Sequence, residues 1–126
     1  MTIASLEDLR DAIRESKGPD RELDAAFARL VCGMDVRRGL AGEWYLHVAN
    51  RRLPHFFDSL AGPGALFAAA LAGWPDVALR VEAWMSGVGP QALAMFEDRR
   101  EERHPLLTHA LALAMVEAAI QERDRA

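Results

Sequence analysis

Hydrophobic residues recur with two different periods along the chain, and the change of period separates expected strands from expected helices. From Val77 to Met85 every second residue is apolar, which is typical of a strand with one face against a core. The two glycines and the proline in residues 86–90 suit a short hairpin loop, and a second apolar run follows over residues 91–97. We therefore expect a hairpin at the centre of a sheet against which the helices pack.

Near the two ends and in the middle of the chain, apolar residues instead recur every three to four positions, the spacing of one helix face. The pair Gly18-Pro19 is expected to end a first helix, since proline cannot continue the helical hydrogen bonds. Asp20 is a suitable cap for a second helix, and Pro63 suits the first turn of a third. The expected helices cover residues 6–16, the stretch between residues 20 and 33, and residues 65–72.

Residues 105–122 form the densest apolar stretch and are expected to make a last helix, which Pro105 opens. Its large apolar side chains cover most of the helix circumference, so more than one side must be buried. The helix therefore lies either between the sheet and the other helices or with one face against a partner. Residues 121–126 are expected to fray into solvent.

Residues 43–49 also alternate, with Trp44 and Leu46 on one side and Tyr45 and His47 on the other. This alternation predicts another strand. The expected elements then follow one another in the order α-α-β-α-β-β-α. Because the neighbouring strands form a hairpin, we expect the α+β class, with an antiparallel sheet of about three strands packed with helices.

Composition sets limits on the class of protein. The chain has 126 residues, of which 51% are apolar, so residues 1–126 are expected to form a single domain with its own core. No apolar run approaches the ~20 residues that span a bilayer, and the N-terminus lacks the features of a signal peptide. A cytoplasmic protein without a membrane partner is expected. The net charge of −4 argues against nucleic acid as a partner, and the single Cys32 excludes an internal disulfide.

No group of residues has the spacing of a catalytic or metal site. His104 and His109 are five residues apart, which on a helix would place them about 140° apart rather than on one face. The Gly62-Pro63-Gly64 stretch lacks the lysine and hydroxyl residue of a phosphate loop and is interpreted as a helix start. No serine stands in a nucleophile motif. We therefore expect no catalytic residue, no metal, no cofactor and no enzymatic activity.

A candidate partner-binding surface consists of Tyr45, Trp84, Arg51 and Arg52. The two aromatic residues fall on the strand sides opposite the expected core. If helices cover both faces of the sheet, they belong to a second core; if that face is open, they form an aromatic patch of the kind that anchors partners. The arginine pair is either ordinary solvated surface or part of a local basic patch at one edge.

Two segments resemble the phage α-β-α (ABA) sandwich domain family of small phage and prophage proteins. Residues 18–26 (Gly-Pro-Asp-Arg-Glu-Leu-Asp-Ala-Ala), behind a short leucine-rich helix, are similar to the opening of these proteins. Residues 105–114 (Pro-Leu-Leu-Thr-His-Ala-Leu-Ala-Leu-Ala) are similar to their closing helix. The resemblance implies an α/β sandwich and a phage or prophage origin, hence action inside a bacterial host. It carries no catalytic residues to this chain.

Taken together, these observations favour a small non-enzymatic accessory protein, encoded by a phage or prophage, that acts by protein–protein binding. One specific hypothesis is an inhibitor of a bacterial defence system, such as an anti-CRISPR protein. The alternative is a structural or assembly protein of the virion that forms a homodimer or larger homo-oligomer through the apolar last helix. A small enzyme is a third alternative.

Overall fold

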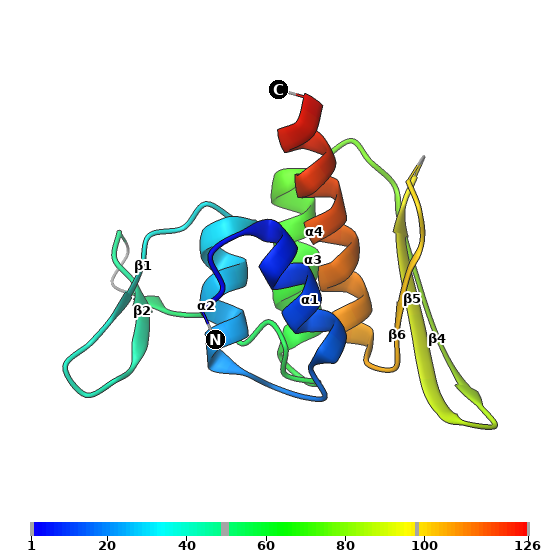
Figure 1. Ribbon diagram of the computed structural model, residues 1–126, viewed down its shortest axis with the longest axis horizontal. Coiled ribbons are helices and arrows are strands. Elements are labelled where there is room, and N and C mark those ends of the chain that lie inside the picture. The colour runs from blue at the N-terminus through cyan, green and yellow to red at the C-terminus, as the bar shows by residue number, and fades with distance from the viewer. Residues whose placement is uncertain (1, 49–50, 98, 126) are drawn as a thin grey trace.

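Helix α4 (Leu107–Arg125) runs through the middle of the computed structural model, which describes residues 2–48, 51–97 and 99–125. Helices α1 and α3 pack against it and α2 packs against α1, while two small sheets lie at opposite ends of the molecule (Figure 1). Within these ranges, no helix has both the length and the apolar character needed to cross a membrane. Ala49, the last residue of the expected strand over residues 43–49, lies outside the described residues.

The elements follow the chain in a regular alternation of helices and sheets. The outer helices are α1 (Leu6–Glu15), α2 (Arg21–Leu30) and α3 (Gly62–Gly73). The first sheet has the order β1 (Val36–Arg38), β2 (Trp44–Leu46), β3 (Arg51–Arg52). The second sheet has the order β4 (Leu79–Ser86), β5 (Gly89–Phe96), β6 (Glu102–His104). All neighbouring strands are antiparallel.

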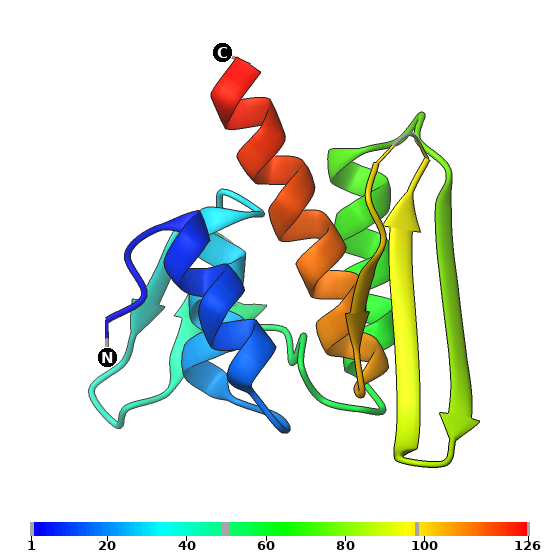
Figure 2. The ribbon, with the colours of Figure 1, turned by 45° about the vertical axis from the view of Figure 1, so that its right-hand side comes forward.

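The α+β class is confirmed, and the expected order of elements broadly matches the observed one. The expectation of one sheet centred on the hairpin is corrected. The hairpin β4–β5 is present, but β4 is an edge strand and β5 occupies the centre, because β6 adds to its far side. The strand around Trp44 pairs instead with its own neighbours β1 and β3, so it builds a second, separate sheet (Figure 2).

Local signals fix where the first two helices begin. The hydroxyl of Ser5 accepts the backbone N–H of Asp8 at 3.1 Å, and the carboxylate of Asp20 accepts the N–H groups of Glu22 and Leu23. Each cap satisfies N–H groups that have no partner within the helix. The prediction that Asp20 caps the second helix is therefore confirmed.

Helix α4 is buried almost throughout its length, from Thr108 to Val116 without a break. Of the two placements that its apolar circumference allowed, the structure has the helix between the second sheet and the other helices. The stretch from Thr108 to Val116 is therefore covered within the single chain, whereas residues 122–125 of the helix are exposed.

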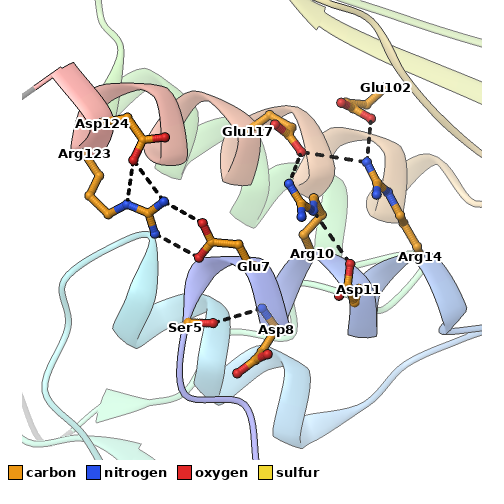
Figure 3. A network of polar contacts seen from close by, with 10 residues as sticks. All are labelled: Ser5, Glu7, Asp8, Arg10, Asp11, Arg14, Glu102, Glu117, Arg123 and Asp124. Carbon is orange, nitrogen blue, oxygen red and sulfur yellow. Dashed lines mark hydrogen bonds and ion pairs between the residues drawn. The ribbon is translucent and has the colours of Figure 1, made fainter.

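The expectation that α4 frays after residue 121 is wrong, since the helix continues to Arg125. Arg123 forms a two-pronged ion pair with Glu7 of α1 (Figure 3). This hydrogen-bonded guanidinium holds the pKa of Glu7 at about 2. Arginines in the last turn also interact favourably with the negative end of the helix dipole, so the polar end remains helical.

The Gly62-Pro63-Gly64 stretch begins α3, as interpreted, and its first glycine is required by a close approach. A Cβ on Gly62 would lie 2.3 Å from the carbonyl oxygen of Phe56 and 2.8 Å from the Thr108 methyl carbon. Phe56 and Phe57 both pack on Phe27, with ring centroids 4.9 Å and 6.0 Å apart respectively. This aromatic cluster ties the loop before α3 to the α2–α4 core.

The second sheet packs only one of its faces on the helices. Ala92, Ala94 and Phe96 of β5 are buried toward α4, and Val81 of β4 is half-buried on the same side. On the opposite face Trp84 is 38% exposed, because no helix of the described chain covers that side (Figure 2). The open-face alternative therefore holds for Trp84.

Candidate functional site

A groove of about 780 Å³ lies between the first sheet and the N-terminal end of α2. The register of the sheet places Tyr45 directly opposite Arg52 and Leu46 directly opposite Arg51. Tyr45 is half-buried, whereas both arginines are exposed. The structure thus brings together three of the four residues that were predicted to form a partner-binding surface. The residues that line the groove and could contact a bound segment include Arg21, Arg38, Tyr45, Arg51, Arg52 and His55.

Trp44 lies under two guanidinium groups beside this groove. The guanidinium carbon of Arg38 is 4.8 Å from the centroid of the indole ring and that of Arg29 is 5.4 Å from it. Arg38 also pairs with Glu22 at 3.7 Å and donates from Nε to the carbonyl of Gly42 at 3.1 Å. These contacts fix the arginine and the indole by cation–π attraction and hydrogen bonding, so this wall of the groove is preorganised.

Arg51 and Arg52 differ from Arg38 in that neither forms an ion pair with any residue in the described ranges. Both project from β3, a strand of two residues, with exposed side chains. A guanidinium group presents five N–H donors in a planar fork that matches a carboxylate. The sheet register places Arg52 on the same face as Tyr45 and Arg51 on the face of Leu46, and both arginines line the groove.

A buried clamp holds the chain that follows β3. Arg21 donates to the Asp24 carboxylate at 2.8 Å and to the carbonyls of Leu53 and Pro54 at 2.8 Å and 3.0 Å. Asp24, only 2% exposed, also accepts the backbone N–H of Phe57 at 3.1 Å. Burial raises the pKa of the Asp24 carboxyl, against the opposing influence of Arg21. The clamp joins α2 to the segment that positions the two free arginines.

The charge of the groove is mixed rather than uniformly basic. Asp20, Glu22 and Glu43 line it together with its four arginines. Such a surface can recognise a segment that carries carboxylates among other polar groups. It does not provide the continuous positive track that a nucleic-acid backbone requires.

Trp84 lies on a separate surface, on the outer face of the second sheet at the other end of the molecule (Figure 1). Its indole ring is 5.8 Å from the guanidinium carbon of Arg103 on β6. A period of two assigns a residue to one side of a strand but does not say to which sheet that strand belongs. Tyr45 and Trp84 therefore do not form one aromatic patch.

His104 and His109 stack on each other, with ring centroids 4.7 Å apart. The 140° separation that a shared helix would impose does not apply, because His104 belongs to β6 and only His109 is on the helix. His104 Nε2 lies 3.1 Å from the carbonyl oxygen of Ser16, and its Nδ1 accepts the N–H of Leu106 at 2.9 Å. The ring thus satisfies a carbonyl at the C-terminal end of α1.

His109 also forms a contact that resembles a nucleophile–base pair, since its Nε2 lies 2.9 Å from the hydroxyl oxygen of Ser16. That hydroxyl donates to the carbonyl of Gly18 at 3.0 Å, so it accepts from the imidazole. Nδ1 correspondingly accepts from the hydroxyl of Thr108 at 2.9 Å. Burial, followed by the neighbouring His104, lowers the pKa of His109 to about 4. The imidazole is a donor to Ser16, which indicates a structural cap rather than a base.

A second polar cleft, of about 320 Å³, lies between α1, α4 and the chain before β6. Arg10 pairs with Glu117 at 3.3 Å, and Arg14 bridges Glu117 and Glu102 at 3.8 Å and 3.9 Å (Figure 3). Burial and the nearby Glu117 raise the pKa of Glu102. The ion pairs of Arg10 and Arg14 join α1 to α4 and β6.

Within the described ranges, no three histidine, cysteine, aspartate or glutamate side chains are placed to hold a metal ion together. Cys32 is half-buried, and burial raises the pKa of its thiol to about 11, so it remains protonated at neutral pH. No protein-family model, curated protein sequence or solved structure matches the chain. The candidate site therefore rests on its own geometry.

Sequence reasoning missed several residues of the groove: Arg21, Arg38, Trp44 and His55. Trp44 was assigned to the core side of its strand, and the structure confirms that it is partly buried. The signal that points to the groove is the presence of arginine residues on both sides of the strand around Tyr45, at Arg37-Arg38 and Arg51-Arg52. Antiparallel pairing of these short neighbouring strands brings the arginines on either side of Tyr45 close together.

Proposed function

We propose that this protein acts by binding another protein, without catalysis, and that the groove beside the first sheet receives an acidic segment of that partner. The observation that carries the proposal is the pair Arg51 and Arg52, which lie unpaired within the described structure beside Tyr45 in a groove of about 780 Å³. A cleft of this size suits a few residues of an extended peptide or a loop.

The residue types in the groove favour a protein partner. Arginine, tyrosine and tryptophan are enriched at protein interfaces and supply most of the residues that dominate binding energy. The groove carries both signs of charge, since Asp20, Glu22 and Glu43 lie among the arginines. Charges of both signs can fix the orientation in which a polar segment binds.

The resemblance of residues 18–26 and 105–114 to the phage ABA sandwich family supports a phage or prophage context for this binding. We accordingly propose that the partner belongs to a bacterial host and that a defence complex of the CRISPR type is a suitable target. An inhibitor of such a complex needs only to occupy a surface, which a small protein with a preorganised groove can do.

The groove is tested with a fluorescein-labelled peptide of six glutamates, titrated with the protein and followed by fluorescence anisotropy. We expect binding that weakens with salt and that the double variant Arg51→Glu/Arg52→Glu weakens about tenfold or more, since attractive contacts become repulsive. The matched control Arg103→Glu/Arg125→Glu changes the net charge equally at exposed positions outside the groove. Equal weakening by both double variants would contradict a groove-specific site.

The biological part of the proposal needs an independent measurement. Expression of the protein in a bacterium with an active CRISPR system should raise the plating efficiency of a targeted phage. The Arg51→Glu/Arg52→Glu variant should lose this effect, whereas the control double variant should keep it. Unchanged plating with the unmodified protein across several defended hosts would count against a defence inhibitor.

A further inference from the structure

Strand β4 presents an unpaired edge of eight residues, the longest strand edge among the described elements. Its other side is fully paired with β5, and no element in the described part of the chain covers the free edge (Figure 2). Proteins normally shorten, cover or kink such edges, because their free N–H and C=O groups pair readily with another strand. The edge of β4 contains no proline and no bulge.

The register with β5 shows which backbone groups point outward. The carbonyl of Ala78 accepts the N–H of Glu97 at 2.7 Å, so Ala78 belongs to the set of residues that bond toward β5. Hydrogen bonding alternates along an antiparallel strand, so the next residues in that set are Arg80, Glu82 and Trp84. The intervening residues present their backbone groups to the free edge. They are Leu79, Val81, Ala83 and Met85.

We propose that β4 pairs antiparallel with β4 of a second copy of this chain, about a two-fold axis at Val81. The pairing would join the two three-stranded sheets into one continuous sheet of six strands. A two-fold axis requires a self-complementary surface, because the same strand of both copies forms the contact and the two strands run in opposite directions. The edge of β4 meets this requirement in both its charges and its apolar residues.

The charges select the register. With Val81 opposite Val81 of the second copy, Arg80 of each chain lies opposite Glu82 of the other, which forms two cross-strand ion pairs. The neighbouring registers that keep the same hydrogen-bonding set are centred on Arg80 or on Glu82. Each of those places like charges directly opposite, which is unfavourable. Both side chains are exposed on the open face and already contact each other within one chain.

The apolar residues agree with the same register. On the inner side, an apolar groove of about 290 Å³ lies between α3 and the beginning of β4, with Phe67 and Leu71 partly exposed beside it. Val77 lines this groove, and in the proposed register Met85 of the second copy lies opposite Val77. Met85 is 76% exposed in the single chain. Pairing therefore covers apolar side chains that are otherwise open to water.

Self-association is measured by sedimentation equilibrium over concentrations up to about 0.5 mM, with circular dichroism as a check of folding. We expect a dimer for the unmodified chain. Arg80→Glu places two glutamates opposite each other at both symmetric positions, and Glu82→Arg does the same with arginines. Each single variant should weaken the dimer about tenfold or more. The double variant Arg80→Glu/Glu82→Arg restores opposite charges and should recover most of the affinity.

Two further variants separate this edge from other surfaces. Val81→Pro removes an N–H that points away from β5, so it should abolish the dimer while the fold persists. Arg37→Glu reverses an exposed arginine on the first sheet and should leave the dimer unchanged. A monomer over the whole concentration range, a dimer insensitive to these changes, or no recovery in the double variant would overturn the proposal. Because the first sheet, which carries the arginine groove, lies at the opposite end of the molecule from β4 (Figure 1), peptide binding can succeed or fail independently of the dimer.

Discussion

The two sheets of this protein are attached to the helices by different kinds of contact. The second sheet packs small apolar residues of β5, such as Ala92 and Ala94, directly on α4. The first sheet has shorter strands, places Val36 in the core with Trp44 and Leu46 partly buried against it, and is followed by a segment that the polar clamp of Arg21 and Asp24 holds on α2. The second sheet therefore contributes several residues of β5 to the core, whereas the first sheet contributes fewer apolar side chains and is supported in addition by directional polar contacts.

If the groove binds a partner as proposed, this difference separates the residues that stabilise the fold from those that recognise the partner. The second sheet contributes to the core, so its centre tolerates little change, and only its free edge is available for contact. The first sheet buries less apolar surface, and its exposed arginines are therefore free to face a ligand. Burial of charged groups is costly, so a groove rich in arginine is better placed on the sheet that contributes less to the core.

The largest expected effect is a loss of stability in acid, at the joint between β6, α4 and α1. His109 is neutral in the folded protein with a pKa of about 4, whereas an unfolded histidine has a pKa of about 6.5. Between these values the unfolded chain binds a proton that the folded chain does not. The contribution of His109 to the unfolding free energy is fully present above about pH 6.5. It decreases as the pH falls through this window, by up to about 3 kcal/mol.

The measurement is urea unfolding at pH 7 and pH 4, for the unmodified protein and for His109→Gln. Glu102 and Asp24 have raised pKa values, which favour the folded state in acid and act in the opposite direction. The informative quantity is thus the difference between the two proteins. The unmodified chain should lose about 2–3 kcal/mol more than the variant; equal losses would show that His109 is not the group responsible.

The next effect concerns the apolar attachment of the second sheet. Ala94 is fully buried between β5 and α4, so Ala94→Leu should overpack this contact and lower the unfolding free energy by about 2–3 kcal/mol. Ala83 lies in β4 and is exposed, and Ala83→Leu should change stability by less than about 0.5 kcal/mol. Chemical denaturation measures both, and a similar cost for the two variants would contradict the proposed difference between core and edge.

A smaller effect is expected at the polar attachment of the first sheet. Asp24→Ala removes the acceptor of the buried Phe57 N–H and one partner of Arg21, at a cost of about 2 kcal/mol. Asp35→Ala removes an exposed ion pair with Arg37 and should cost less than about 0.5 kcal/mol. Hydrogen exchange should show faster exchange in β2 and β3 of Asp24→Ala with β5 unchanged. Faster exchange throughout the molecule would instead show that the clamp supports the whole fold.

Local chemistry made much of the fold predictable. The cap at Asp20, the proline at the start of α3 and the alternation from Val77 to Met85 all depend on neighbours in sequence, and each corresponds to an observed element. The division into two sheets was not predictable in the same way. It depends on which strands pair, and β6, with only three residues, gives no periodic signal of its own.

The candidate site was predictable only in part, for the same reason. Tyr45, Arg51 and Arg52 are close in sequence, so local antiparallel pairing brings them together. Trp84 is aromatic, like Tyr45, but belongs to a hairpin that is distant in sequence. The stacking of the two histidines was not predictable from their spacing, because His104 lies in β6 and His109 on α4, so that their contact depends on how the strand and the helix pack.

The three tryptophans provide the most direct test of the central claim, that recognition resides in the groove of the first sheet. Trp44 lies beside the groove, Trp84 lies on the second sheet, and the Trp74 indole donates to Glu122 on α4. Their indole N–H signals can be followed together in a ¹⁵N-resolved NMR spectrum as the hexaglutamate peptide is added. We predict that the Trp44 signal shifts progressively while the Trp74 and Trp84 signals remain in place. A shift of the Trp84 signal with Trp44 unmoved, or no shift of any indole at peptide excess, would contradict the account.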